Sequence, residues 1–163
     1  MPLIKNGAFE DDKWVAVDDD SDLPADKPVI LSLARWQAER ETLVGRNAPV
    51  AVKLQSSEAP DALQADLDRL AMIALDFPAF KDGRGYSYAR VLREHFGFEG
   101  EIRATGEVLR DQWLAMTRCG VDAFIVADNV TLEAFNEAVN ELSLVYQPTG
   151  DGRKTVMQLR HGN

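Results

Sequence analysis

The sequence predicts an α/β protein whose mostly parallel sheet is built from about five βα units. Between Val29 and Leu142, short apolar runs of strand length alternate with longer segments in which apolar residues recur at helical spacing. With 163 residues, the chain suits one domain spanning residues 1–163. It is too short for a closed eightfold barrel, which usually needs about 250 residues, so we expect either an open sheet or a partial barrel.

Residues 1–28 are expected to form a small hairpin followed by an acidic linker. Asn6-Gly7 is a typical tight-turn pair, and Trp14–Val17 is the predicted second arm. The segment Asp18–Asp22 contains four aspartates. Such a run fits a solvated linker, with the alternative that it steers a basic partner.

Residues 29–146 are expected to form the βα core. Consecutive βα units imply parallel strands that are joined by right-handed crossovers. The strands are predicted at 29–33, 50–54, 73–76, 101–105 and 123–127, and the helices at 34–43, 60–70, 87–95, 107–118 and 131–142. Residues 147–163 are expected to be a C-terminal tail or, at 155–159, a final edge strand.

Composition narrows the classes of function. The formal net charge of −9 argues against non-specific binding to nucleic acid, which needs a basic face, and against adhesion to anionic membranes. No apolar run approaches membrane-spanning length and the first residues lack an apolar signal core, so a cytoplasmic protein is expected. The single cysteine, Cys119, excludes an internal disulfide, and with only His95 and His161 as histidines no metal site is expected.

The segment 81–88 is the main candidate site. It joins the carboxyl end of a predicted strand to the amino end of a predicted helix, and parallel α/β proteins bind ligands at that edge. Glycines let the backbone approach a ligand, and free helix amides together with cations favour an anion. We therefore predict a pocket for an oxyanion or a phosphate group, with a solvated surface turn as the alternative. The candidate residues are Lys81, Asp82, Gly83, Arg84, Gly85, Tyr86 and Arg90.

Three charged residues lie in or at the end of successive predicted strands, namely Lys53, Asp76 and Arg103. Burying an unpaired charge is very costly. If sequential strands are neighbours, the three could converge at the carboxyl edge, where Asp76 would hold one of the two cations. The alternative is that they are unrelated residues with exposed tips.

The turn after the fourth predicted strand offers a second corner that could receive an anion. Gly106 precedes a helix whose first turns carry Arg110 and Asp111. The alternative is a plain turn with Arg110 in solvent.

Cys119 falls at a helix carboxyl end, which disfavours a reactive thiolate, so we expect a structural thiol. No Gly-x-Gly-x-x-Gly fingerprint follows the first strand of the core, so a dinucleotide site lacks support and the cofactor stays unknown.

Four motifs together resemble one bacterial family, catalogued as domain of unknown function 934. The resemblance is strongest over residues 72–128. It implies a role near assimilatory sulfite reductase, beside which members are usually encoded, and the family label is a putative oxidoreductase involved in sulfite reduction. The family supplies no established catalytic residues. The motifs are Phe77-Pro-x-Phe-x-Asp-Gly-Arg-Gly-Tyr-Ser-x-Ala-Arg90, Gly97-Phe-x-Gly-Glu-Ile-Arg103, Gly106-x-Val-Leu-Arg-Asp-Gln112 and Arg118-Cys-Gly-x-Asp-Ala-Phe124.

Two classes of function follow from the sequence and the resemblance. The first is an accessory protein or oxidoreductase of sulfite reduction that binds a small oxyanion or a phosphorylated metabolite at 81–88. Any electrons would then come from a partner or an unrecognised cofactor. The second is a non-catalytic adaptor that docks on sulfite reductase or its electron donor through an acidic surface. Self-association is left open.

Overall fold

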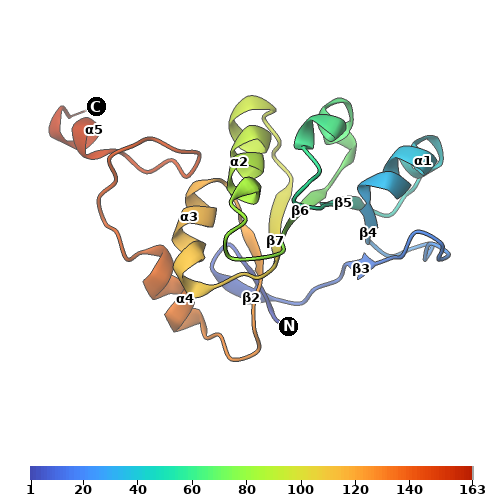
Figure 1. Ribbon diagram of the computed structural model, residues 1–163, viewed down its shortest axis with the longest axis horizontal. Coiled ribbons are helices and arrows are strands. Elements are labelled where there is room, and N and C mark those ends of the chain that lie inside the picture. Colours follow the sequence, from blue (N-terminus) through green and yellow to red (C-terminus); the bar gives the residue numbers. More distant parts are fainter. Residues whose placement is uncertain (163) are drawn as a thin grey trace.

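The computed structural model describes residues 1–162 and shows one curled, mixed sheet of eight strands (Figure 1). The strand order is β2-β1-β8-β7-β6-β5-β4-β3. Five strands run parallel in chain order, as in half of a barrel, which confirms the predicted α/β class and the partial-barrel alternative. These are β4 (Val29–Ser32), β5 (Val50–Leu54), β6 (Met72–Phe77), β7 (Glu101–Gly106) and β8 (Ala123–Ile125).

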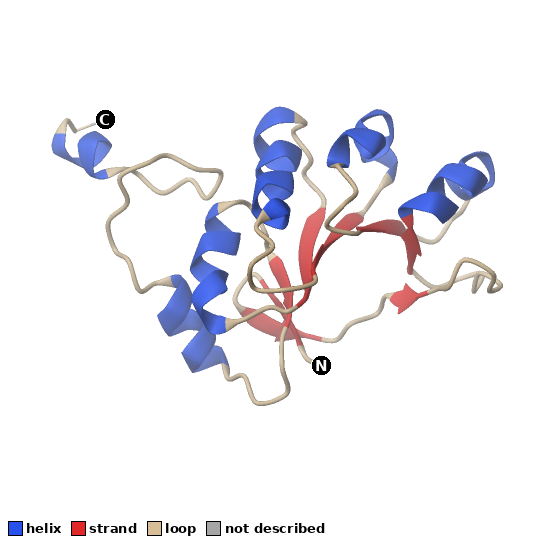
Figure 2. Ribbon diagram, in the orientation of Figure 1, coloured by secondary structure: helices blue, strands red, loops and turns tan. Residues whose placement is uncertain are grey.

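Helices cover the convex face of the sheet (Figure 2). Alternate strand residues, among them Val52, Ile73 and Leu75, are fully buried and pack against these helices, because successive side chains of a strand point to opposite faces. The covering elements are α1 (Leu33–Val44), the 3₁₀ helix η1 (Pro60–Arg69), α2 (Arg84–Arg90), its π-helical continuation η2 (Val91–His95), the 3₁₀ turn η3 (Arg110–Gln112), α3 (Trp113–Arg118) and α4 (Leu132–Val139).

The N-terminal hairpin is present, but its second arm is not where the sequence predicted it. Strand β1 (Leu3–Lys5) pairs with β2 (Ala8–Glu10) directly across Asn6-Gly7. Both turn residues have positive φ, 50° and 79°, as a tight primed turn requires. The pairing of Trp14–Val17 with this arm is therefore wrong.

The residues expected in that arm lie at the opposite edge of the sheet. Strand β3 (Val15–Ala16) pairs in parallel with β4, whereas β2 forms the first edge. Residues 11–14 therefore cross the concave face of the sheet, below the strands in Figure 1. The apolar side chains at 14–17 gave a strand signal without specifying the partner strand.

The C-terminal residues form a helix, so the edge strand at 155–159 is wrong. Helix α5 (Val156–Arg160) begins with a capping box, in which Gln158 N donates to Thr155 Oγ1 at 3.2 Å and Thr155 N donates to Gln158 Oε1 at 2.7 Å. These local hydrogen bonds outweigh the β-propensity of Thr155 and Val156. None of the helices within residues 1–162 is long and apolar enough to cross a membrane.

Candidate functional site

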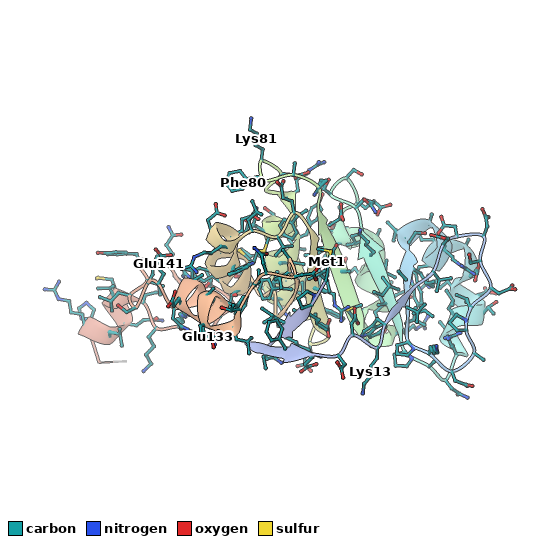
Figure 3. The ribbon with its side chains drawn as sticks, turned by 90° about the horizontal axis from the view of Figure 1, so that it is seen from below. Met1, Lys13, Phe80, Lys81, Glu133 and Glu141 are labelled. Atoms are coloured by element: carbon teal, nitrogen blue, oxygen red, sulfur yellow. The ribbon has the colours of Figure 1, made fainter. Side chains whose placement is uncertain are left out.

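The loop after β6 lies at the carboxyl edge of the parallel sheet, as predicted. Strands β6 and β7 run parallel, with Asp76 opposite Thr105. The loop is shorter than expected, however, because α2 begins at Arg84 rather than at Ser87. At the loop tip, Phe80 and Lys81 point outward into solvent (Figure 3).

The carboxylate of Asp82 occupies the position at the start of α2 where an external anion was predicted. It accepts from Arg84 N at 3.2 Å, from Arg84 Nε at 2.9 Å and from Arg84 Nη2 at 2.7 Å. Arg84 also donates to Ser56 Oγ at 3.0 Å. The hydrogen bonds from Arg84, and then that from Ser56, hold the pKa of Asp82 well below its usual range. The chain thus supplies its own anion at this helix start.

The loop that carries Ser56 is joined to α2 by a second contact. Tyr88 Oη donates to the carbonyl oxygen of Ser56 at 3.1 Å. Together with the Arg84 contact, this bond ties the loop after β5 to the helix after β6. Sequence analysis missed Ser56, since nothing in its neighbourhood resembles a binding motif.

Two glycines that we assigned to ligand approach are required by packing around Phe77. A Cβ on Gly85 would lie 2.5 Å from the Phe77 ring. A Cβ on Gly106 would lie 2.5 Å from the carbonyl oxygen of Phe77, and Gly106 also has a φ of +92°. Tyr86 packs edge-on against the same ring, with centroids 5.4 Å apart, and its burial raises the pKa of the phenol. The glycine pattern therefore reflects close packing here.

Lys53 and Asp76 meet at the carboxyl edge. Lys53 Nζ lies 2.7 Å from Asp76 Oδ1, and Thr105 Oγ1 lies 3.5 Å from the same oxygen. The strand register makes this contact possible, since β5 and β6 are parallel neighbours in which Lys53 lies opposite Ala74. The pair neutralises itself.

Arg103 does not join that pair, although the sequence allowed it to. Its side chain lies on the concave face, 1% of the residue is exposed, and it bonds Glu101 at 2.7 Å and Asp12 at 2.9 Å. Lys5 bonds the other oxygen of Glu101 at 2.9 Å. The sequence could have predicted Glu101 as a partner of Arg103, because residues two apart on a strand lie on the same face. Asp12, 91 positions away in the chain, carried no such signal.

The remaining predicted cations lie in other parts of the molecule. Arg90 bonds both carboxylate oxygens of Glu94 along the helix, at 3.1 and 2.9 Å. Arg110 donates to the carbonyl oxygen of Ala134 at 3.0 Å and thereby joins η3 to α4, while Asp111 is exposed. The candidate residues are thus spread over the carboxyl edge, the concave face and the outer helices.

The acidic segment lies at the same edge as the loop after β6. Ser32, the last residue of β4, donates its hydroxyl to Asp19 Oδ1 at 2.6 Å, and Arg35 donates to the carbonyl oxygen of Asp18. These bonds fix the segment beside the carboxyl end of β4. The other carboxylates of the run, on Asp18, Asp20 and Asp22, belong to exposed residues.

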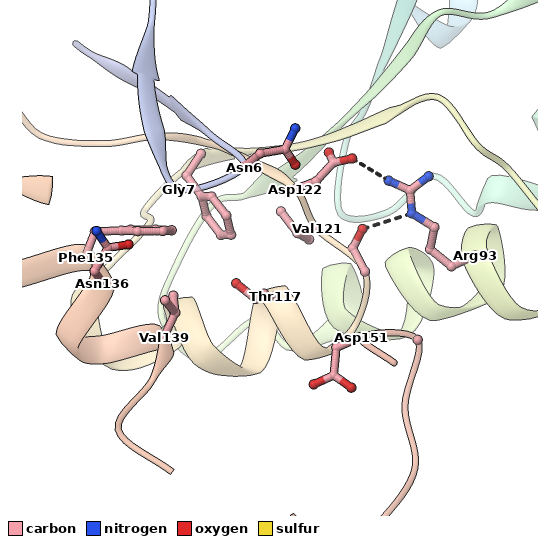
Figure 4. Close-up of a pocket in the computed structure, with 13 residues that line it drawn as sticks. Asn6, Gly7, Arg93, Thr117, Val121, Asp122, Phe135, Asn136, Val139 and Asp151 are labelled. Carbon is pink, nitrogen blue, oxygen red and sulfur yellow. Dashed lines mark hydrogen bonds and ion pairs between the residues drawn. The ribbon is translucent and has the colours of Figure 1, made fainter. Parts of the chain in front are cut away.

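A pocket of about 470 Å³ lies at the amino edge of the sheet, beside the Asn6-Gly7 turn and between α3 and α4 (Figure 4). The charged groups on one wall are already paired, because Arg93 bonds Asp122 at 2.9 Å and the carbonyl oxygen of Gly120 at 3.0 Å. Burial raises the pKa of Asp122 despite the neighbouring Arg93. Close to this pocket, burial also raises the pKa of the Cys119 thiol, which disfavours the thiolate.

A family model described as "Bacterial protein of unknown function (DUF934)" matches residues 51–157. The chain therefore belongs to this bacterial family, and the resemblance inferred from the four motifs is confirmed. No curated protein sequence matches the chain at a significant level.

Within residues 1–162, no group of three or more His, Cys, Asp or Glu side chains is arranged to hold a metal ion.

Proposed function

We propose that the protein is an accessory factor of assimilatory sulfite reduction that docks, through its acidic carboxyl edge, on a basic face of sulfite reductase or of its electron donor. The link to sulfite reduction rests on the family resemblance. The mode of action rests on the charges of the edge. Acidic groups steer a basic partner toward the sheet, and complementary charges speed its association.

The observation that carries the proposal is the unequal pairing of charges at this edge. The cations Lys53 and Arg84 are neutralised by Asp76 and Asp82. In contrast, Asp18–Asp22 leaves three exposed carboxylate residues in solvent, against one exposed cation, Lys81, at the tip of the loop after β6. The edge therefore presents net negative charge to a partner, which suits a basic protein surface better than a free oxyanion.

A docking role also agrees with the reactivity of the one thiol. Burial keeps Cys119 protonated to higher pH than a free cysteine, so it is a poor nucleophile and a poor electron-transfer group at neutral pH. Under this proposal the redox cofactor belongs to the partner.

Binding of an oxyanion at residues 81–88 remains a second candidate, because the guanidinium of Arg84 and the hydroxyl of Ser56 converge there. An external anion would have to displace the carboxylate of Asp82 from Arg84.

Replacing Asp82 by Asn removes the competing negative charge while preserving the size of the side chain. If the site binds oxyanions, sulfite, sulfate or phosphate should stabilise Asp82→Asn against heat more than they stabilise the parent. Equal melting temperatures with and without these anions, in both proteins, would remove this candidate.

The docking proposal is tested with the combined variant Asp18→Asn, Asp20→Asn and Asp22→Asn, which leaves the Asp19–Ser32 bond intact. Its affinity for sulfite reductase or for the electron donor, measured by calorimetry at low salt, should fall at least about tenfold, equivalent to about 1.4 kcal/mol. The loss should shrink as salt increases, because salt screens exposed charges.

A matched control changes charge equally on the convex face, where Glu41, Asp61 and Asp68 are exposed on α1 and η1. Glu41→Gln with Asp61→Asn and Asp68→Asn should bind like the parent. If both triple variants lose the same affinity for the partner, the loss comes from the change in net charge and not from the acidic segment. Parent-like binding by the acidic-segment variant, or no binding by the parent to either partner, refutes the proposal.

A further inference from the structure

The chain ends in an apolar segment that leaves the body of the molecule, which we call the C-terminal arm and define as residues 140–162. The arm extends from α4 to α5, away from the sheet and its helices (Figure 1). Five large apolar side chains on it are more than half exposed, and Tyr146 is exposed to 81%. The others are Leu142, Leu144, Met157 and Leu159. Apolar groups gathered in this way on one segment usually mark an interaction surface.

The base of the arm is held to the body by specific hydrogen bonds, so the arm has a defined path. Arg118 of α3 donates to the carbonyl oxygen of Gln147 at 2.7 Å and pairs with Asp151 at 3.3 Å. Arg153 donates to the carbonyl oxygen of Val139, the last residue of α4, at 2.8 Å. Val145, also in the base of the arm, is buried and pairs with Thr155 in an isolated β-bridge.

The outer part of the arm has less support beyond its first residues, where Thr155 is buried and Val156 N donates to the carbonyl oxygen of Val145 at 2.8 Å. Helix α5 (Val156–Arg160) has five residues and buries none of them. Isolated helices shorter than about 12 residues are marginal in water, and most helices of proteins are stabilised by packing of an apolar face. The apolar side chains of α5 are therefore available to pack against a surface outside this chain.

The charges on the arm indicate what that surface is. Residues 1–139 contain 15 Lys and Arg against 25 Asp and Glu, a net charge of −10. Residues 140–162 contain three cations against two carboxylates, a net charge of +1. The arm thus lacks the negative charge of the body, and its exposed cations Lys154 and Arg160 complement the acidic body of another copy.

An acidic ridge lies on α4 and continues into the first residues of the arm, beside the basic outer part of the arm in the same molecule. Glu133 and Glu137 are exposed four residues apart on α4, which places them on one side of the helix. Glu141 is exposed where the arm leaves the body (Figure 3). Arg110 lies 3.6 Å from Glu137, but both side chains are more than half exposed, so a cation of a partner can replace this pairing at little cost. Lys154 and Arg160 are exposed on the outer arm. A patch with an acidic and a basic half side by side is self-complementary, as the interface of a twofold dimer must be.

We propose that the C-terminal arm binds a second copy of this chain, with Tyr146 and α5 of each protomer packed against α4 of the other. The cations of each arm then face the acidic ridge of the partner protomer. This contact is independent of the docking role proposed above, because the arm and the acidic segment lie at opposite ends of the molecule in Figure 1. One dimer would therefore present two acidic edges to its partners.

The proposal is tested by light scattering of the full chain after size exclusion, over a range of protein and salt concentrations. We expect a dimer that dissociates on dilution, and sooner at high salt. The variant Leu144→Ser with Tyr146→Ser should be monomeric while its body unfolds at the same urea concentration as the parent monomer. Phe80→Ser, which removes an exposed apolar side chain from the loop after β6, should leave the dimer intact. A parent protein that is monomeric at every concentration overturns the proposal.

Reversing the charges on the two proposed contact surfaces distinguishes this specific contact from non-specific apolar association. Lys154→Glu with Arg160→Glu should weaken the dimer at least about tenfold, and so should Glu137→Lys with Glu141→Lys. The four changes together should restore much of the affinity, because the charges are again complementary. If the fourfold variant is as weak as either double variant, the arm does not meet the acidic ridge and the proposed dimer is wrong.

Discussion

Arg103 and Arg84 show how differently two arginines of the same predicted site are used. Arg103 is buried on the concave face and is held by Glu101 and Asp12. Arg84 lies at the exposed carboxyl edge and is held by Asp82, two residues before it. The first pairing joins segments 91 residues apart, whereas the second is local.

The difference separates a structural ion pair from one that a ligand could exchange. A buried guanidinium that loses its partners is left desolvated and unpaired, so its network must stay intact for the fold. An exposed guanidinium can exchange its partner for water or for another anion at little cost. Of these two arginines, Arg84 at the carboxyl edge is therefore the one suited to reversible binding.

The largest expected effect is the loss of the concave network. Removing one partner of a buried ion pair typically costs about 3–5 kcal/mol, because the remaining charges stay buried without compensation. Arg103→Ala leaves the buried carboxylate of Glu101 with Lys5 as a remaining cation, while Asp12 is partly exposed. The variant should therefore lower the free energy of unfolding by about 3 kcal/mol, the lower end of this range, in a urea titration. A loss below about 1 kcal/mol would mean that Arg103 is no more structural than Arg84.

An intermediate effect is expected at the glycines around Phe77. Gly106→Ala places a Cβ against the Phe77 carbonyl group in a backbone conformation that alanine avoids, and should cost about 1–3 kcal/mol of unfolding free energy. Gly83→Ala serves as the control, since its nearest neighbour, the Tyr86 ring, lies at 4.0 Å and its φ is −86°. The free energy of unfolding of the control should lie within about 0.5 kcal/mol of that of the parent. If both variants unfold alike, Phe77 does not set the glycine requirement.

The smallest effect is expected from Arg84→Ala, which should change the melting temperature little at neutral pH because the side chain is solvated. The pKa of Asp82 is lower in the folded state than in the unfolded state. The Arg84–Asp82 pair therefore contributes its stability above the ordinary aspartate pKa of about 4 and loses it as the pH falls through the folded-state pKa. Parent and variant should thus converge in melting temperature as the solution is acidified. A difference that grows toward low pH would contradict this assignment.

The sequence by itself determined the α/β class, the approximate position of each parallel strand and the family. Buried parallel strands are apolar runs such as Val50–Leu54, and they carry their signal locally. The motifs that contain Gly85 and Gly106 also identified the family before the structure explained those glycines.

Only the tertiary structure decided the edge taken by Val15–Ala16, the partners of Arg103 and the true start of α2. Each of these depends on contacts whose two members lie far apart in the chain or compete with an equally good local alternative. The second reason applies at the start of α2, where Asp82 bonds Arg84 from two residues away in the chain and an external anion would have to displace that carboxylate. Charge pairing follows proximity after folding, which spacing in a sequence does not specify.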